Sequence, residues 1–346
     1  MQKFLVIQTA FIGDVVLATA LLEKLHACYP DAQIDFLVRK GNEALLAGHP
    51  FVHETLVWDK KQNKLRNLWR MTRRIRLEKY DKVINVQRFA ATGILTAFSG
   101  AKETIGFDKN PLSRFFTRRI PHVISARVEP GKIPTGPTVH EVGRNQALIA
   151  TFTDKEPAQP RLYPTAADVH KVASYKDRPY ITISPASVWF TKQFPANQWA
   201  SFIRALSAPL TVYLLGASGD RKLGDSIMTM AATNNIVNLA GELSFLQSAA
   251  LMKGAVMNYV NDSAPMHFAS ALNAPVTAVY CSTIPGFGFG PLSDDSHVVE
   301  IEAPLSCRPC GLHGFKACPQ GHFNCTRKIE DRQLLATLAK VNPATS

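Results

Sequence analysis

The sequence predicts an α/β protein with two doubly wound parallel sheets, one in each half of the chain. Two observations predict this fold. Short apolar runs alternate with helical patterns in both halves, and a proline-rich stretch after Phe152 separates the two series. Parallel strands need helical crossovers, so this alternation is typical of Rossmann-like folds. We therefore expect two Rossmann-like domains facing across a cleft.

The predicted elements follow that alternation along the chain. In the first half, strands are expected at residues 4–7, 34–38 and 82–86, and a helix at 15–29. In the second half, strands are expected at residues 180–184, 211–215, 255–260 and 276–280, with a helix at 199–206. We expect a first domain over 1–155, a linker over 156–178 and a second domain over 179–346. The second domain would include a cysteine-rich segment at 307–325 and a C-terminal helix.

Composition indicates an ordinary globular chain of 346 residues, with 46% hydrophobic and 19% charged residues. No apolar run reaches the length of a membrane span. The first strand is too short for a signal-peptide core and Asp14 follows it, so we expect a cytoplasmic protein. The formal net charge of +12 favours an anionic partner: nucleic acid, an anionic membrane or a phosphorylated substrate.

The turn between the first strand and the first helix carries the first candidate residue. Residues 8–14 lack the G-x-G-x-x-G pattern, and Gly13 is their only glycine, which argues against an NAD-dependent dehydrogenase. Asp14 begins the helix. It is either a helix cap worth about 1 kcal/mol or a carboxylate that takes a proton from an attacking hydroxyl.

A second set of candidates follows the first strand of the second half. Ser187, Thr191 and Lys192 precede a helix start. Hydroxyl and backbone N–H groups can donate hydrogen bonds to a phosphate, and a lysine can neutralise leaving-group charge. The alternative for Lys192 is a solvated surface lysine, which is the usual environment of that residue.

A third set lies where the strand at 255–260 runs into the next helix. Asp262 and Ser263 open this turn, and His267 lies one turn into the helix. Free N–H groups and the positive end of the helix dipole would face an anionic ligand there. His267 is equally well explained as a histidine of the core.

Four segments together resemble the lipopolysaccharide heptosyltransferase family, which is glycosyltransferase family 9. The matching pieces are residues 11–16, Ser187 with 191–195, residues 216–220, and residues 261–263 with 266–267. They occur in the family's order from Met1 to about residue 290. No single piece is specific, whereas the ordered set is.

The resemblance implies a GT-B fold, with the acceptor mainly on the first domain and the nucleotide-sugar on the second. It implies inverting transfer of heptose from ADP-heptose to a lipopolysaccharide core, either Kdo–lipid A or a heptosyl acceptor, with no metal required for catalysis. One alternative is a related GT-B glycosyltransferase that uses another nucleotide-sugar. A nucleic-acid-binding protein is the alternative from a different class, and it leaves the set of Asp14, Lys192 and Asp262 unexplained.

The resemblance also implies roles for individual residues. Asp14 matches the catalytic base, and Asp220 matches a carboxylate that contacts the nucleoside. Residues that match the donor-binding segments are Ser187, Thr191, Lys192, Asp262, Ser263 and His267. The chain departs from the family at residues 188–190 and 264–265, which bears on the identity of the donor sugar.

Two basic regions are candidates for binding the acceptor or a membrane. Residues 60–79 predict an amphipathic helix. Its charged face is either merely solvated or attracted to an anionic membrane surface, by about 1 kcal/mol per basic residue. Further candidates for the acceptor side are Gly13, Arg114, Arg118, Arg119, His140 and Arg144.

The cysteines suggest a structural role near the end of the chain. Cys307, Cys310, Cys318 and Cys325 include one C-x2-C pair, which is a usual half-site for structural zinc. The wide spacing of the second pair leaves open the alternative of thiols, reduced or disulfide-linked, that pin a loop.

Overall fold

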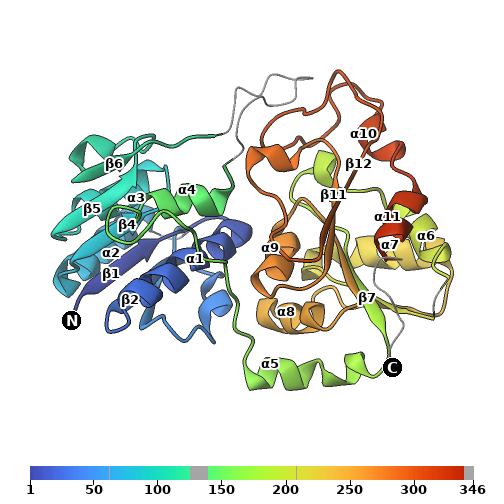
Figure 1. Ribbon diagram of the computed structural model, residues 1–346, viewed down its shortest axis with the longest axis horizontal. Helices are drawn as coiled ribbons and strands as arrows, with labels where there is room; N and C mark the ends of the chain where they lie inside the picture. The colour runs from blue at the N-terminus through green and yellow to red at the C-terminus, as the bar shows by residue number, and fades with distance from the viewer. Residues whose placement is uncertain (62, 125–138, 208, 339–346) are drawn as a thin grey trace. The chain divides into compact units, whose positions relative to one another are not determined.

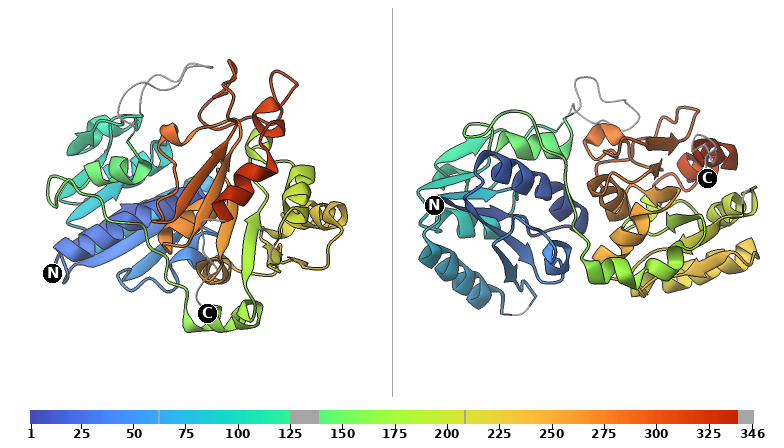
Figure 2. Two further views of the ribbon diagram at one scale, coloured as in Figure 1. Left: turned by 45° about the vertical axis from the view of Figure 1, so that its right-hand side comes forward. Right: turned by 60° about the horizontal axis from the view of Figure 1, so that its bottom comes forward.

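The computed structural model describes residues 1–61, 63–124, 139–207 and 209–338. The chain divides into two compact units. The first comprises Met1–Val123 and Val139–Tyr163, and the second contains the described residues from Pro164 onward (Figure 1). In each unit, helices cover both faces of a single sheet (Figures 1 and 2).

The first unit is built on a six-stranded parallel sheet with the order β3-β2-β1-β4-β5-β6. Its strands are β1 Lys3–Ile7, β2 Gln33–Arg39, β3 Glu54–Trp58, β4 Lys82–Asn85, β5 Glu103–Phe107 and β6 Arg118–Ile120. β1 is central: its Phe4 pairs with Ile34 on one side and with Lys82 on the other. The strand order reverses on either side of β1, so the turn after β1 lies where ligands bind in doubly wound folds.

The helices of the first unit are α1 Ile12–Cys28, α2 Lys64–Glu78, α3 Ala90–Ala97 and α4 Glu141–Ala147, with short 3-10 turns η1 Glu43–Leu46 and η2 Ser113–Phe115. α1 packs with α4, and α2 packs with α3. Right-handed crossovers on either side of β1 place these two pairs on opposite faces of the sheet. Met71 and Ile75 of α2 pack against Leu5 and Leu37 in the hydrophobic core between α2 and the sheet.

The second unit repeats this plan, with the strand order β12-β11-β10-β7-β8-β9. Its parallel strands are β7 Tyr180–Ser184, β8 Thr211–Leu214, β9 Ile236–Asn238, β10 Met257–Asn261, β11 Val276–Tyr280 and β12 Ser296–Glu300. Its helices are α5 Ala166–Lys171, α6 Ala196–Arg204, α7 Arg221–Ala231, α8 Phe245–Lys253, α9 Ala264–Ala271, α10 Asn324–Arg327 and α11 Asp331–Leu338. The 3-10 turns are η3 Ala173–Lys176, η4 Phe190–Lys192, η5 Ser218–Asp220 and η6 Pro285–Phe287. Trp199 and Phe202 of α6 fill the core beside Tyr259 of β10.

The predicted fold class is confirmed, because both sheets are parallel and are connected by helices. The basic amphipathic helix predicted within residues 60–79 is observed as α2. Element ends shift by a few residues: the helix expected at 199–206 is α6, Ala196–Arg204, and the strand expected at 255–260 is β10. The strands β3, β5, β6, β9 and β12 were not predicted.

Candidate active site

Lys192 forms a shielded ion pair at the carboxyl edge of the second sheet. It ends the 3-10 turn η4 after β7, and its Nζ atom lies 2.6 Å from Oδ2 of Asp262. The side chains of Lys192 and Asp262 are only 14% and 9% exposed. Lys192 is therefore not a solvated surface lysine, because its ammonium group meets a carboxylate away from bulk water.

Asp262 follows β10 and has a second side-chain partner. The hydroxyl of Thr283, which is fully buried just after β11, donates to the same Oδ2 atom at 2.7 Å. One carboxylate oxygen thus joins the turns after three neighbouring strands, β7, β10 and β11. Threonine is an ordinary residue at the end of a strand, so no local pattern in the sequence singled out Thr283.

Thr191 is buried beside Lys192 and holds its turn in place. Its Oγ1 atom accepts the Phe315 N–H at 2.7 Å and lies 3.0 Å from the Ser282 hydroxyl. The Thr191 N–H in turn donates to the Phe315 carbonyl at 3.1 Å. Its described contacts therefore fix the loop that carries Lys192.

Asn261 connects the turns after β7 and β10 from the other side. Its Oδ1 accepts the Phe194 N–H at 3.0 Å, and its Nδ2 donates to the Pro185 carbonyl at 2.8 Å. The next residue but one, Ser263, is the N-cap of α9, and its hydroxyl lies 3.4 Å from the Asn261 carbonyl. His267 of the same helix is buried, with its ring beside that of Phe289.

The remaining donor candidates lie at the same edge of the sheet. The carbonyl of Ser187, in the loop after β7, accepts Gln193 Nε2 at 2.6 Å. Asp220 ends η5 after β8, and its carboxylate accepts the Ala217 N–H at 2.8 Å. Gly216 is required there, since a Cβ atom on it would lie 2.9 Å from Cβ of Asp220.

Four adjacent strands thus end in side chains that suit a nucleoside diphosphate. In the order β11, β10, β7 and β8, their turns carry Thr283, Asp262, Lys192 and Asp220. The N-terminus of α9 adds backbone N–H groups at the end of β10. A lysine and preorganised N–H donors can stabilise a departing diphosphate without a metal ion.

In the first unit, Asp14 lies in the first turn of α1, directly after β1. Its Oδ2 accepts the Phe11 N–H at 3.0 Å, so Asp14 does cap the start of α1. Gly13 is buried beside it, whereas Phe11 is 60% exposed. Accepting one backbone hydrogen bond leaves a carboxylate charged, so the cap does not exclude a role as a base.

Two residues that the sequence did not identify as site residues support this turn. Gln87, after β4, donates from Nε2 to the Ala10 carbonyl at 3.0 Å. Lys60, after β3, donates from Nζ to the buried Thr9 hydroxyl at 2.6 Å. Burial, and then the nearby Arg39, lowers the pKa of Lys60 to about 8. In the sequence, Lys60 belongs to the basic segment at residues 60–79. Only the fold places it at the carboxyl edge of the first sheet.

The acceptor-side candidates have varied environments. Arg114 is exposed and lies over the Phe115 ring, 4.7 Å from its centroid, while Arg118 pairs with Glu103. Arg119 is exposed on the edge strand β6. His140 caps α4 by accepting the Val142 N–H at 3.2 Å. Arg144 is buried, and it donates to Glu141 at 2.7 Å and to the Val139 carbonyl at 2.6 Å.

The cysteine-rich segment packs against the same edge of the second sheet. All six cysteines fall within the described residues and are free thiols. Cys307 Sγ lies 3.8 Å from His322 Nε2, and burial, with Cys307 and Cys318 nearby, raises the pKa of Cys310. Among the described residues, no group of three or more histidine, cysteine, aspartate or glutamate side chains is arranged to hold a metal ion. No disulfide joins the cysteines of this segment.

Arg308, between Cys307 and Cys310, connects this segment to the turn after β11. Its guanidinium donates to the carbonyls of Cys281 at 2.7 Å and Thr283 at 2.8 Å. It also pairs with Glu300 of β12 at 2.5 Å. The segment therefore supports the turn that carries Thr283, and neither spacing nor composition indicated this role.

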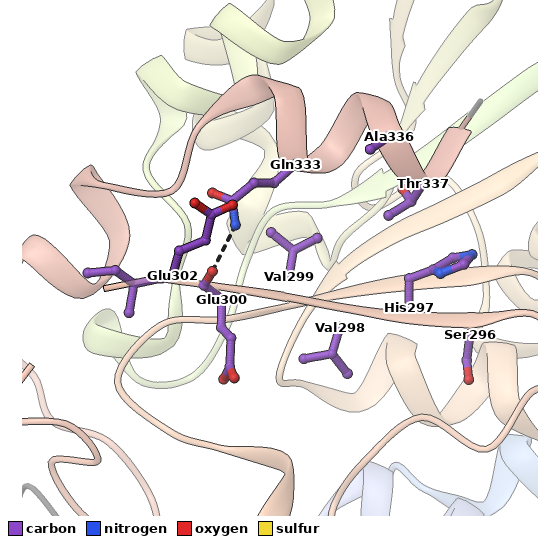
Figure 3. Close-up of a pocket in the computed structure, with 10 residues that line it drawn as sticks. Ser296, His297, Val298, Val299, Glu300, Glu302, Gln333, Ala336 and Thr337 are labelled. Carbon is purple, nitrogen blue, oxygen red and sulfur yellow. Dashed lines mark hydrogen bonds between the residues drawn. The ribbon is translucent and has the colours of Figure 1, made fainter. Parts of the chain in front are cut away.

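A separate hollow of about 550 Å³ lies over β12 and α11 (Figure 3). Gln333 reaches across it, donating from Nε2 to the Glu300 carbonyl at 2.9 Å. Val299 points toward α11, while Val298 and Glu300 point away, as alternation along a strand requires (Figure 3). None of the predicted site residues lines this hollow, so it is not the candidate site.

Residues 68–312 match the model of glycosyltransferase family 9 (heptosyltransferase). The chain belongs to this family. It is therefore a glycosyltransferase, and the resemblance noted from its sequence is confirmed. In the described part of this family 9 chain, no helix is long and apolar enough to span a membrane.

Its relatives include proteins named as heptosyltransferases. The family 9 chain is 24% identical over 315 residues to lipopolysaccharide heptosyltransferase 2 of Escherichia coli, covering 87% of this chain and 88% of that one. It is 25% identical over 371 residues to lipopolysaccharide heptosyltransferase 1 of Pseudomonas aeruginosa, covering 99% and 95%. The solved structure of E. coli ADP-heptose lps heptosyltransferase II superposes with a TM-score of 0.78 at 22% identity, over 98% of each chain. The fold is that of the GT-B heptosyltransferases.

Proposed function

We propose that this protein transfers heptose from ADP-heptose to a lipopolysaccharide core acceptor, with inversion at the transferred carbon. The observation that carries the proposal is the shielded Lys192–Asp262 pair at the carboxyl edge of the second sheet. It puts a cation where phosphates bind in this type of sheet. The relatives' names support the chemistry: one is described as an ADP-heptose enzyme, and several act on lipopolysaccharide.

On the donor side, Lys192 and the N-terminus of α9 would hold the diphosphate of ADP-heptose. Ser187, Thr191, Ser263 and His267 lie in the loops and helix around them. As the bond to the sugar breaks, negative charge develops on the departing ADP, and the lysine and N–H groups stabilise it. Asp220, after β8, would contact the nucleoside. No metal ion is required for these steps.

On the acceptor side, Asp14 would take the proton of the attacking hydroxyl. Its position after β1, the central strand where the order reverses, supports this role. Acceptor binding would use the first unit, with Gly13, the arginines 114, 118, 119 and 144, and His140 as candidates. A core acceptor is either Kdo–lipid A or a heptosyl lipid, so the enzyme would work peripherally at the cytoplasmic face of a membrane.

A direct assay tests this proposal. Purified protein is incubated with ADP-heptose and detergent-dispersed Kdo–lipid A, and ADP release is followed together with product mass. We expect a product one heptose heavier with the wild type, and formation of that product slower by on the order of 10²–10³ with Lys192→Met that remains folded. Folded wild-type protein that neither binds ADP-heptose nor forms product would overturn the heptose assignment and leave another nucleotide-sugar as donor.

A further inference from the structure

The outward side of α2 carries large apolar side chains in water. Leu65 is 82% exposed, Trp69 is 71% exposed and Leu77 is 69% exposed. Phe98, at the end of the neighbouring helix α3, is 55% exposed. A single exposed apolar residue is ordinary on a protein surface, but a group of them on adjacent helices indicates an interaction site.

Arginines are interspersed with these apolar side chains. We call this surface the α2 face, and its residues are Leu65, Arg66, Trp69, Arg70, Arg73, Arg76, Leu77 and Phe98. Every one of its arginines is exposed. α2 lies on the outside of the first unit, packed against β3 and α3 (Figures 1 and 2).

Helix geometry separates this face from the part of α2 that packs. Met71, Thr72 and Ile75 are buried and hold α2 against its sheet. At 3.6 residues per turn, Arg70, Arg73 and Leu77 lie on the opposite side. Leu65 and Trp69 lie on the flank beside Thr72, and both remain exposed there. These exposed side chains are not part of the hydrophobic core, so they can contact a binding partner.

The charge on α2 is unbalanced within the helix. Its 15 residues include six lysines or arginines and a single acid, Glu78, which pairs with Lys3 at 3.5 Å. Arg74 pairs with Glu54 of β3. Arg66 lies four residues before Arg70, a spacing at which like charges destabilise a helix.

The first turn of α2 adds to this imbalance. It contains no acid and begins with Lys64, although the positive end of the helix dipole favours acids there. An anionic partner relieves both sources of repulsion.

We infer that the α2 face docks on an anionic lipid surface. Its arginines meet the phosphates of the headgroups, while Trp69, Leu65 and Leu77 enter the boundary between headgroups and acyl chains. Basic residues with tryptophan or leucine on one helix are the usual composition of interfacial helices. Nucleic acid is also anionic, but it offers no apolar layer for these side chains. The inference rests on the proposed function in one respect: the proposed acceptor is a lipid, so docking would bring the enzyme to its substrate.

Vesicle binding tests the inference without any acceptor. Sedimentation is measured with vesicles of phosphatidylcholine alone and with phosphatidylglycerol added. We expect binding only to the anionic vesicles, with a blue shift of tryptophan emission. Trp58 and Trp199 are buried, and the shift should disappear in Trp69→Phe. The triple variant R66Q/R70Q/R73Q should bind these vesicles more weakly, on the order of 100-fold.

A matched control separates this face from net charge. R178Q/K253Q/K328Q removes three exposed charges from the second unit and should keep vesicle binding. The inference would be overturned if both triple variants lost vesicle binding equally, or if the wild type bound neither kind of vesicle. It would also be overturned if duplex DNA competed equally for the protein and the Trp69 emission did not shift. Transfer to detergent-dispersed acceptor should be the same in R66Q/R70Q/R73Q and wild type. Failure of docking and failure of the proposed transfer are therefore distinguishable.

Discussion

Oδ2 of Asp262 lies 2.6 Å from Lys192 Nζ and also accepts the hydroxyl of Thr283. This relationship holds the lysine before any donor is bound. In the proposed donor site, an arriving diphosphate would share Lys192 with Asp262. Preorganisation of this kind reduces the reorganisation that charge development in the transition state would otherwise demand.

Removing the charge of Lys192 should impair transfer much more than folding. We expect Lys192→Met to lower kcat by on the order of 10²–10³, the usual effect of deleting one preorganised donor at a developing negative charge. ADP release under saturating ADP-heptose measures it. Lys253→Met, at an exposed position in α8, is the matched control and should retain the wild-type rate. A Lys192→Met variant with wild-type kcat would exclude Lys192 from the chemical step.

Thr283 should act through Asp262 as a positioning residue. Thr283→Val keeps the shape of the side chain but removes a hydrogen bond to the Asp262 carboxylate, and bonds to charged groups contribute about 1.5–3 kcal/mol. We expect a rise in KM for ADP-heptose together with a smaller fall in kcat. Thr283→Ser restores the hydroxyl and should restore KM. If Thr283→Ser behaves like Thr283→Val, the hydroxyl is not what positions Asp262.

Arg308 should couple the cysteine-rich segment to the site. Arg308→Met removes the hydrogen bonds to the Cys281 and Thr283 carbonyls. We expect a loss of about 1.5–3 kcal/mol in the free energy of unfolding, typical for a bond to a charged donor, and weaker ADP binding by calorimetry. Arg332→Met removes a fully exposed arginine that pairs with Glu302 and should leave both unchanged. Normal ADP binding in Arg308→Met would make the segment's role purely structural.

The sequence predicted the fold and the ends of the site-bearing strands because both depend on local patterns. Apolar runs and helix periodicity repeat in each half, and parallel strands place their carboxyl ends at one edge. Lys192 and Asp262 follow two of these strands, and the family resemblance carried by the ordered set of segments singled them out.

Other members of the site could not be found in this way. Thr283 and Arg308 matter through partners distant in sequence, and Lys60 reaches Thr9 only when β3 lies two strands from β1. Threonine, arginine and lysine at such positions are ordinary, so no local signal distinguishes them. The cysteine spacing likewise does not distinguish a structural metal site from thiols without a metal, because the geometry of metal ligands depends on the folded loop.

Acid should destabilise the first unit through His122. Burial, then Arg88 and Arg144, lowers the pKa of His122 to about 4, and Asp108 opposes them. Unfolded histidine has a pKa of about 6.5, so between pH 6.5 and 4 the unfolded state binds a proton that the folded state excludes. The free energy of unfolding should therefore fall as the pH falls, by at most about 1.4 kcal/mol per pH unit.

Urea unfolding at several pH values checks this expectation. His122→Gln cannot bind the proton, so its stability should fall less steeply between pH 6.5 and 4 than that of the wild type. The pKa of His49 is also lowered to about 4 by burial, so part of the pH dependence should remain in the variant. Identical slopes in His122→Gln and wild type would mean that His122 titrates alike in the folded and unfolded states.

Asp14 presents a choice between a cap and a base, and one substitution separates them. Asp14→Asn keeps an oxygen that can accept the Phe11 N–H, so stability should change by no more than about 1 kcal/mol. An amide cannot take a proton from the acceptor hydroxyl, so transfer should fall by on the order of 10²–10⁴.

Asp168 provides the matched control for that experiment. Its Oδ2 accepts the Thr165 N–H at 2.9 Å at the start of α5, which is the same capping arrangement away from the site. Asp168→Asn should leave the transfer rate unchanged. Thermal unfolding and ADP release are compared for both variants. A fall in rate confined to Asp14→Asn, with both proteins folded, requires the Asp14 charge in the reaction. Equal rates in the two variants would reduce Asp14 to a helix cap and move the search for the base elsewhere in the first unit.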